Sequence, residues 1–149
     1  MLERLSENPW PVFGAIALAS FVGYVAWRNN FKIRRAQASQ SFRSVILCKL
    51  AGLYPIPTNW PTSIDSHLRQ IFPELQRAVA EFRPYVPWHA RRSFDAAWFV
   101  YRLGRDGREI DKQLYHQYMG FTSPGRPVID PKETFRANVD KLLSFARET

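Results

Sequence analysis

The uncharged stretch from Trp10 to Trp27 constrains this chain more than any other feature of its sequence. A helix over these residues covers about 26 Å at roughly 1.5 Å per residue, close to the hydrocarbon thickness of a bilayer. Tyr24 joins the two tryptophans at the ends of the stretch, where aromatic rings prefer the headgroup level. We therefore expect one transmembrane helix over residues 10–27. The alternative is a buried helix of a soluble protein, because the stretch is short and rich in alanine.

The flanks of this stretch predict its orientation. Arg4 is the only base before it, whereas four bases follow within eight residues: Arg28, Lys32, Arg34 and Arg35. Short flanks rich in Lys and Arg stay in the cytoplasm, so we expect the N-terminus outside and the rest inside. A cleaved signal peptide would carry its bases on the other side. The chain then divides into an anchor with a basic juxtamembrane segment, 1–35, and a cytoplasmic domain, 36–149.

Small residues recur at a helical spacing within the predicted span. Ala15, Ala19 and Gly23 lie four residues apart, which places them on one face and lets another helix approach closely. This pattern favours packing against a second membrane helix, of another protein or of the same chain, although alanine and glycine are also common in such helices generally. The span contains no charged residue or histidine, which argues against a channel or transporter.

The remainder of the chain is strongly basic. Residues 28–149 hold 20 of the 21 bases and 11 of the 13 acids, so their formal charge is +9. Such a domain attracts anionic lipid headgroups or nucleic acid. The single cysteine, Cys48, lies in an apolar run and cannot form an internal disulfide, so we expect a buried structural thiol.

Apolar residues at three- and four-residue steps predict an all-α domain. Prolines and glycines mark the boundaries of the helices, and Asp130 with Pro131 predicts a capped start for the last one. We read Pro73 as the first residue of a new helix. A short strand over 45–48 is the alternative for one apolar run. The expected helices cover residues 28–52, 64–72, 73–83, 88–103, 110–118 and 131–146.

The residues that could take part in catalysis or metal binding do not form any recognisable motif. His67, His89 and His116 have no partner at metal-ligand spacing, and no glycine-rich phosphate loop or nucleophile motif occurs. The acids of residues 106–111 alternate with bases, which is typical of a solvated face. We therefore expect no enzyme activity, no cofactor and no metal.

The densest constellation is residues 83–102, where arginines alternate with aromatic residues. Arg91 and Arg92 could bind phosphate, with aromatic faces beside them for stacking. The more economical interpretation pairs both arginines with Asp95 along one helix and packs Phe94 and Trp98 inward. Arg28, Lys32, Arg34, Arg35, Arg91 and Arg92 are thus the candidate contacts for an anion.

Three motifs of the domain carry a resemblance: Glu81 to Pro84, Arg91 to Trp98, and Leu142 to Ala146. Through them the chain resembles a widespread group of short, uncharacterised bacterial proteins, over about residues 40–149. The resemblance implies a bacterial origin and a helical domain, often linked to a membrane segment. It implies no activity and no catalytic residue.

Two hypotheses for function follow. The first is a single-pass protein of the bacterial inner membrane that binds another protein as an accessory subunit or scaffold. The second is a membrane-tethered basic domain that binds nucleic acid or anionic lipid. We favour the first, because most arginines have acids nearby and no nucleic-acid-binding fold is recognisable.

Overall fold

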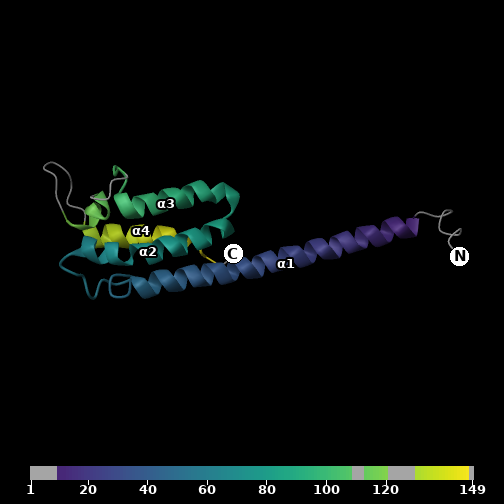
Figure 1. Ribbon diagram of the computed structural model, residues 1–149, viewed down its shortest axis with the longest axis horizontal. Helices are drawn as coiled ribbons and strands as arrows, with labels where there is room; N and C mark the ends of the chain where they lie inside the picture. Colours follow the sequence, from purple (N-terminus) through teal and green to yellow (C-terminus); the bar gives the residue numbers. More distant parts are fainter. Residues whose placement is uncertain (1–9, 109–112, 121–129, 148–149) are drawn as a thin grey trace. The chain divides into compact units, whose positions relative to one another are not determined.

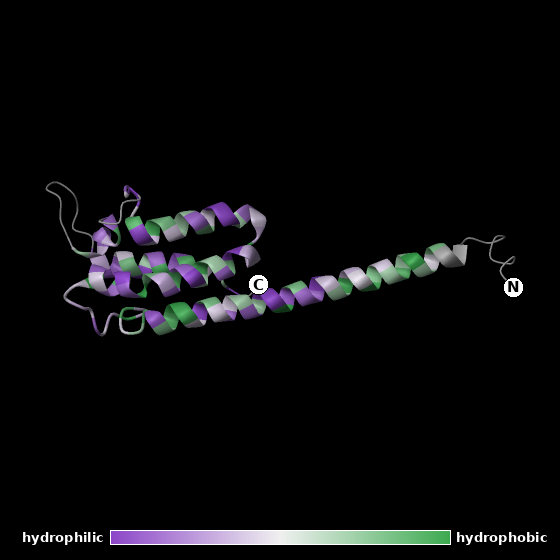
Figure 2. Ribbon diagram, in the orientation of Figure 1, coloured by the Kyte–Doolittle hydropathy of each residue, from purple (hydrophilic) through white to green (hydrophobic). Residues whose placement is uncertain are grey.

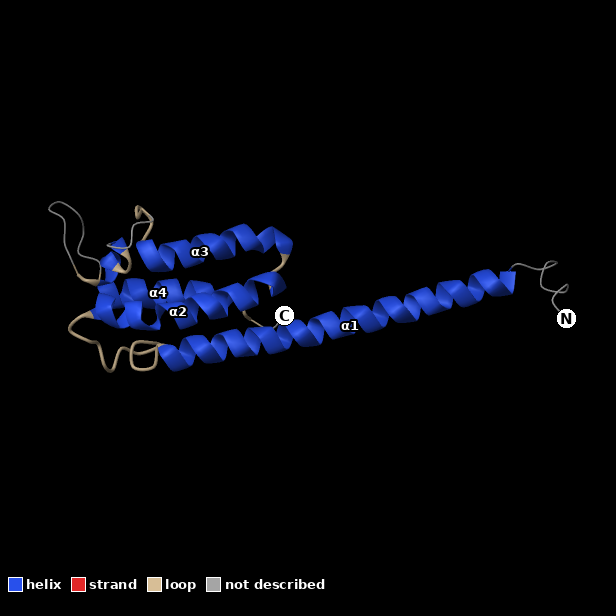
Figure 3. Cartoon of the chain, in the orientation of Figure 1, coloured by secondary structure: helices blue, strands red, loops and turns tan. Residues whose placement is uncertain are grey.

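The computed structural model describes residues 10–108, 113–120 and 130–147 (Figure 1). Over these residues the chain forms α-helices, short 3₁₀ turns and loops without a β-strand (Figure 3), which confirms the all-α class. The chain divides into two compact units, Met1–Gln37 and Ala38–Thr149. This boundary lies close to the predicted one at residue 36. Helix α1, Trp10–Lys49, contributes residues to both units.

The N-terminal unit consists of the first part of α1. Every side chain described from Phe13 to Arg34 is exposed. Figure 2 shows apolar residues along this part of α1, followed by hydrophilic ones toward residue 37. The apolar side chains do not share one face, because steps of 100° distribute them around the helix.

Within the described residues, no helix is both long and apolar enough to cross a membrane. The predicted transmembrane span over 10–27 is therefore not supported by the fold. Gly14, Ser20 and Gly23 interrupt the strongly apolar residues, and Arg28 follows within the same helix.

The second unit packs residues 38–49 of α1 with α2 (Ile64–Phe82), α3 (Arg91–Leu103) and α4 (Pro131–Ser144). Phenylalanines join three of these helices. Phe42 of α1 stacks on Phe82 of α2, with ring centroids 4.7 Å apart. Phe94 of α3 contacts both rings edge-on, at 6.1 and 5.7 Å, and Phe145 beyond α4 at 5.4 Å. Phe94 is completely buried, so it lies at the centre of this core.

Tyrosines form the other part of the core. Tyr101, Tyr115 and Tyr118 are buried, their rings contact one another, and those of Tyr101 and Tyr118 also contact Phe135 of α4. Tyr118 donates its hydroxyl to the Tyr101 carbonyl (2.8 Å) and accepts a hydrogen bond from the Asn138 amide (2.9 Å). Burial raises the pKa of all three phenols above the ordinary value, so they stay neutral.

We expect Tyr118→Phe to lower the free energy of unfolding by about 1–2 kcal/mol, because it leaves the half-buried Asn138 amide without its acceptor. It also removes one of the two hydrogen bonds to the Tyr101 carbonyl, to which Gln117 still donates at 2.9 Å. Tyr101→Phe serves as the matched comparison, since the Tyr101 hydroxyl is buried and has no hydrogen-bond partner in the described chain. That substitution should be neutral or slightly stabilising. Urea unfolding of both variants measures the difference, and equal losses of stability would contradict the assigned hydrogen bonds.

Several predicted helix ends are confirmed. Asp130 accepts a hydrogen bond from the Lys132 amide (2.9 Å) and caps α4, with Pro131 as its first residue. Gly104 ends α3 with φ +78°, a conformation that favours glycine, and its amide binds the Val100 carbonyl. Residues 45–48 lie within α1, so the helix rather than the strand is correct.

Three local predictions are wrong. Pro73 lies inside α2, which continues because Leu68 and Leu75 on either side of it are both fully buried. Cys48 is exposed rather than buried, since α1 turns Ile46 and Leu50 to the core instead. Most of the expected helix 110–118 lies outside the described residues or is not α-helical. Tyr115 has φ +62° there, and a 3₁₀ turn, η5, covers only His116–Tyr118.

Candidate functional site

The predicted helix-packing residues lie on an open surface of α1. Ala15, Ala19 and Gly23 are all exposed. A Cβ added at Gly23 would have no atom of the described chain within 4 Å. This face has room for another helix, and its use for packing stays a prediction.

Four bases that follow the apolar stretch were predicted as anion contacts. Arg28, Lys32 and Arg34 are exposed and Arg35 is half-buried. Among the ion pairs formed by described residues, none includes these four. They therefore form a compact cationic segment directly after the apolar stretch.

The turn between α2 and α3 contains an ion pair that the sequence did not predict. Arg83 donates from Nε and Nη2 to the two Asp95 oxygens, both at 2.8 Å. This guanidinium holds the pKa of Asp95 below its ordinary value. The predicted pairing of Asp95 with Arg91 and Arg92 is therefore wrong, because the carboxylate reaches across the turn to a bidentate partner.

The two arginines at the start of α3 have different roles. Arg91 donates to the carbonyl oxygens of Val86 (3.1 Å) and Pro84 (3.0 Å), so it holds the turn together. Arg92 is exposed and makes no hydrogen bond or ion pair in the described structure. Of these two candidate anion contacts, only Arg92 is free.

The aromatic residues of the same stretch are also of two kinds, buried and exposed. Trp98 is 9% exposed, and its ring stacks with those of Phe72 and Tyr101. Trp88 is 82% exposed, the largest value among the exposed large apolar side chains of the described residues. Residues 83–102 thus supply both core and surface, and Trp88 is the surface residue that periodicity did not single out.

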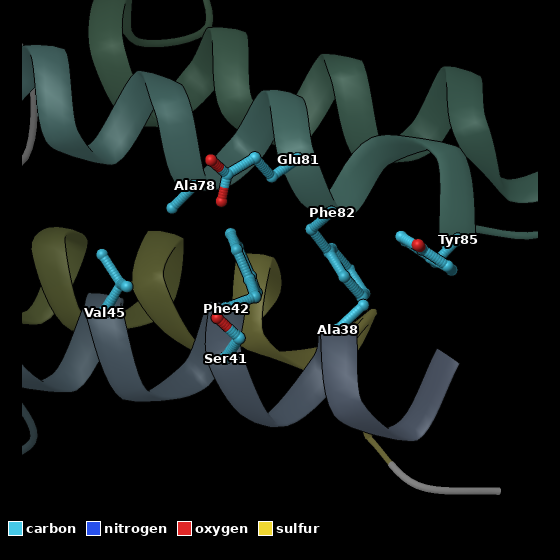
Figure 4. A pocket seen from close by; sticks show the side chains of 8 residues that line it. All are labelled: Ala38, Ser41, Phe42, Val45, Ala78, Glu81, Phe82 and Tyr85. Carbon is cyan, nitrogen blue, oxygen red and sulfur yellow. The ribbon is translucent and has the colours of Figure 1, made fainter. Parts of the chain in front are cut away.

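A cleft of about 290 Å³ lies between α1 and α2 within the second unit (Figure 4). The buried Phe42 and Phe82 line it, and Ser41 and Glu81 are exposed there. Tyr85, from the 3₁₀ turn η2 (Arg83–Tyr85), lines the same cleft as Ala38. The turn between α2 and α3 therefore lies at the end of this unit where its polypeptide begins.

A second hollow lies between α3 and α4. Two adjoining parts, of about 520 and 470 Å³, share Val100, Arg105, Ala137 and Asn138 as lining residues. Ala96 and Ala97 widen it, and Lys141 is a further base on its wall. Glu133 lines it as well, so both signs of charge are present on its wall. The groove exists only when α3 and α4 are packed together.

No group of three or more His, Cys, Asp or Glu side chains in the described residues could hold a metal ion. Comparison with known proteins finds no family model, curated protein or solved structure that matches the chain. The site is therefore defined by its surfaces: the apolar part of α1, the cationic segment, the turn with Trp88 and the α3–α4 groove.

Proposed function

We propose that this chain is a membrane-attached, non-catalytic interaction protein, an accessory subunit or scaffold of the bacterial inner membrane. One observation carries the proposal. The described side chains of α1 up to Trp27 include no charge and leave eight large hydrophobic residues exposed. These residues are Phe13, Ile16, Leu18, Phe21, Val22, Tyr24, Val25 and Trp27.

Exposure of this kind favours a lipid environment. Apolar surface in water is unfavourable by about 25 cal/mol per Å², and isolated exposed residues are common but a continuous run is not. A partner protein covers one face of a helix, whereas lipid covers every face. The large apolar side chains lie around the helix, and this supports insertion into a bilayer through residues 10–27.

The cationic segment supports an orientation for the inserted helix. Arg28, Lys32, Arg34 and Arg35 follow the apolar residues directly. Bases in a short flank favour the cytoplasmic side, where they also meet anionic headgroups at about 1 kcal/mol each. In this proposal the second unit lies in the cytoplasm and presents its groove between α3 and α4 to a partner.

Replacement of Ala15, Ala19 and Gly23 together by leucine tests the interaction. We expect the variant to stay attached to membranes, because leucine is more apolar, but to lose a helix partner that needs close approach. The native mass of the detergent-extracted chain, with co-purifying chains identified by mass spectrometry, should fall to that of the isolated chain. Gly14→Leu with Ala17→Leu, on another face, is the control and should keep the wild-type mass. An unchanged mass of the triple variant would contradict packing through this face.

A further inference from the structure

We propose that the turn between α2 and α3 is a second membrane contact, in which Trp88 and Arg92 dock the helical unit onto anionic lipid headgroups. We call these two residues, together with the exposed His89 whose ring contacts that of Trp88, the Trp88 face. The inference rests on the proposed function, because it needs the chain to be attached to a bilayer.

The Trp88 face is held in place by the turn beneath it. Arg91 fixes the carbonyl oxygens of Pro84 and Val86, and the Arg83–Asp95 pair ties η2 to α3. The Ala90 amide donates to the Pro87 carbonyl (2.9 Å), which closes the 3₁₀ turn η3, Trp88–Ala90. Trp88 is therefore presented to solvent by an ordered backbone, and little conformational freedom is lost when it binds.

The Trp88 face lies close to the start of the second unit's polypeptide. Tyr85 and Ala38 line one cleft, so the turn lies at the end of the second unit where its polypeptide begins (Figure 4). Ten residues, 28–37, connect Trp27 to Ala38. Even fully extended they reach no more than about 35 Å, so in a chain attached to a bilayer through residues 10–27 the covalent tether keeps Ala38 within that distance of Trp27.

The chemistry of the face matches a headgroup layer. A tryptophan ring places its apolar body toward acyl chains and its N–H toward water, and an arginine binds phosphate. The tether adds a high effective concentration to a weak contact. Nucleic acid is the less suitable ligand, because a strand is bound by successive stacking residues in a basic groove, and this face offers one exposed tryptophan.

The test uses the full chain reconstituted in vesicles of phosphatidylcholine and phosphatidylglycerol in equal amounts. Flotation of the vesicles first reports whether the chain is attached. Brominated phosphatidylcholine then quenches tryptophan emission at headgroup-proximal depth. We expect part of the quenching to be lost in Trp88→Phe, which should keep the wild-type circular dichroism because Trp88 is exposed.

A second pair of variants tests the charge. Arg92→Ser should reduce the docked population roughly fivefold in the anionic vesicles, as for one basic residue near such a surface. Arg108→Ser, an exposed base beyond the other end of α3, is the matched control and should leave Trp88 quenching unchanged. Vesicles of phosphatidylcholine alone should abolish the difference between the two variants.

The outcomes separate the two proposals. A chain that floats with equal quenching in wild type and Trp88→Phe overturns the Trp88 face and leaves membrane attachment intact. A chain that does not float overturns both. Trp88 emission that responds to a single-stranded oligonucleotide but not to brominated lipid would assign the face to nucleic acid and overturn lipid docking.

Discussion

Leu18→Lys combined with Val22→Lys is expected to release most of the chain from membranes. Both residues are exposed on α1 inside the uncharged stretch, so neither substitution disturbs a packed contact of the chain. A lysine near the centre of an inserted helix costs about 3 kcal/mol, and two of them exceed what a short, alanine-rich stretch contributes. Immunodetection of the chain in carbonate-washed membranes and in the soluble fraction measures the release.

Gln40→Lys with Ser44→Lys is the matched control. These residues are also exposed on α1 and four positions apart, but they belong to the second unit. The same added charge should leave membrane attachment unchanged or slightly strengthened, because bases near a cytoplasmic surface are attracted to anionic lipid. If both double variants remain in the membrane fraction, the attachment does not depend on the apolar part of α1.

Phe94→Ala is expected to lower the free energy of unfolding by about 3–5 kcal/mol, the usual cost of an aromatic-to-alanine change in a core. Phe94 is fully buried and contacts the rings of Phe42, Phe82 and Phe145, so the cavity would lie where α1, α2 and α3 meet. Because a domain of this size has a stability of about 5–15 kcal/mol, the loss is a large part of the total. Urea unfolding in mild detergent, followed by circular dichroism, measures it.

Trp88→Ala provides the comparison for Phe94→Ala. It removes a larger aromatic side chain six residues earlier in the sequence, but that side chain is exposed. We expect a change within about 0.5 kcal/mol, as for most surface substitutions. Similar losses in the two variants would contradict the assignment of Phe94 to the core and Trp88 to the surface.

Helical periodicity in the sequence predicted most of the fold. The buried residues of α3 and α4, such as Phe94, Trp98, Phe135 and Val139, recur at the three- and four-residue steps that predicted those helices. The cap at Asp130 and the stop at Gly104 follow from local chemistry that a sequence displays directly. Elements with strong periodicity and local signals were therefore predictable.

Tertiary packing decided what periodicity could not. Pro73 remains within α2 because residues on both sides of it are buried. From the sequence alone, a proline is equally compatible with the first residue of a new helix. Asp95 has three arginines within reach, and only the packed turn selects Arg83. Similarly, Trp88 and Trp98 are both tryptophans of the same arginine-rich and aromatic stretch. One is exposed and the other buried, because Trp88 lies in the 3₁₀ turn η3 and Trp98 in α3.

Of the candidate functional surfaces, some could be predicted from the sequence and others required the packed domain. The uncharged stretch and the bases after it are visible in sequence, because both depend on composition over neighbouring residues. The groove between α3 and α4 brings Arg105 together with Ala137 and Asn138, residues more than thirty positions away. Periodicity places residues on a helix but does not pair two helices, so this groove required the packed domain.

The measurement that tests membrane attachment most directly is labelling of single cysteines. In a Cys48→Ser background, Leu18→Cys and Gln40→Cys are compared in the purified chain reconstituted in vesicles, with a polar maleimide on both sides of the bilayer. Both positions are exposed in the chain itself, so lipid is what distinguishes them. We predict rapid labelling at position 40, and labelling at position 18 only after detergent is added. Equal labelling rates without detergent would contradict insertion of residues 10–27.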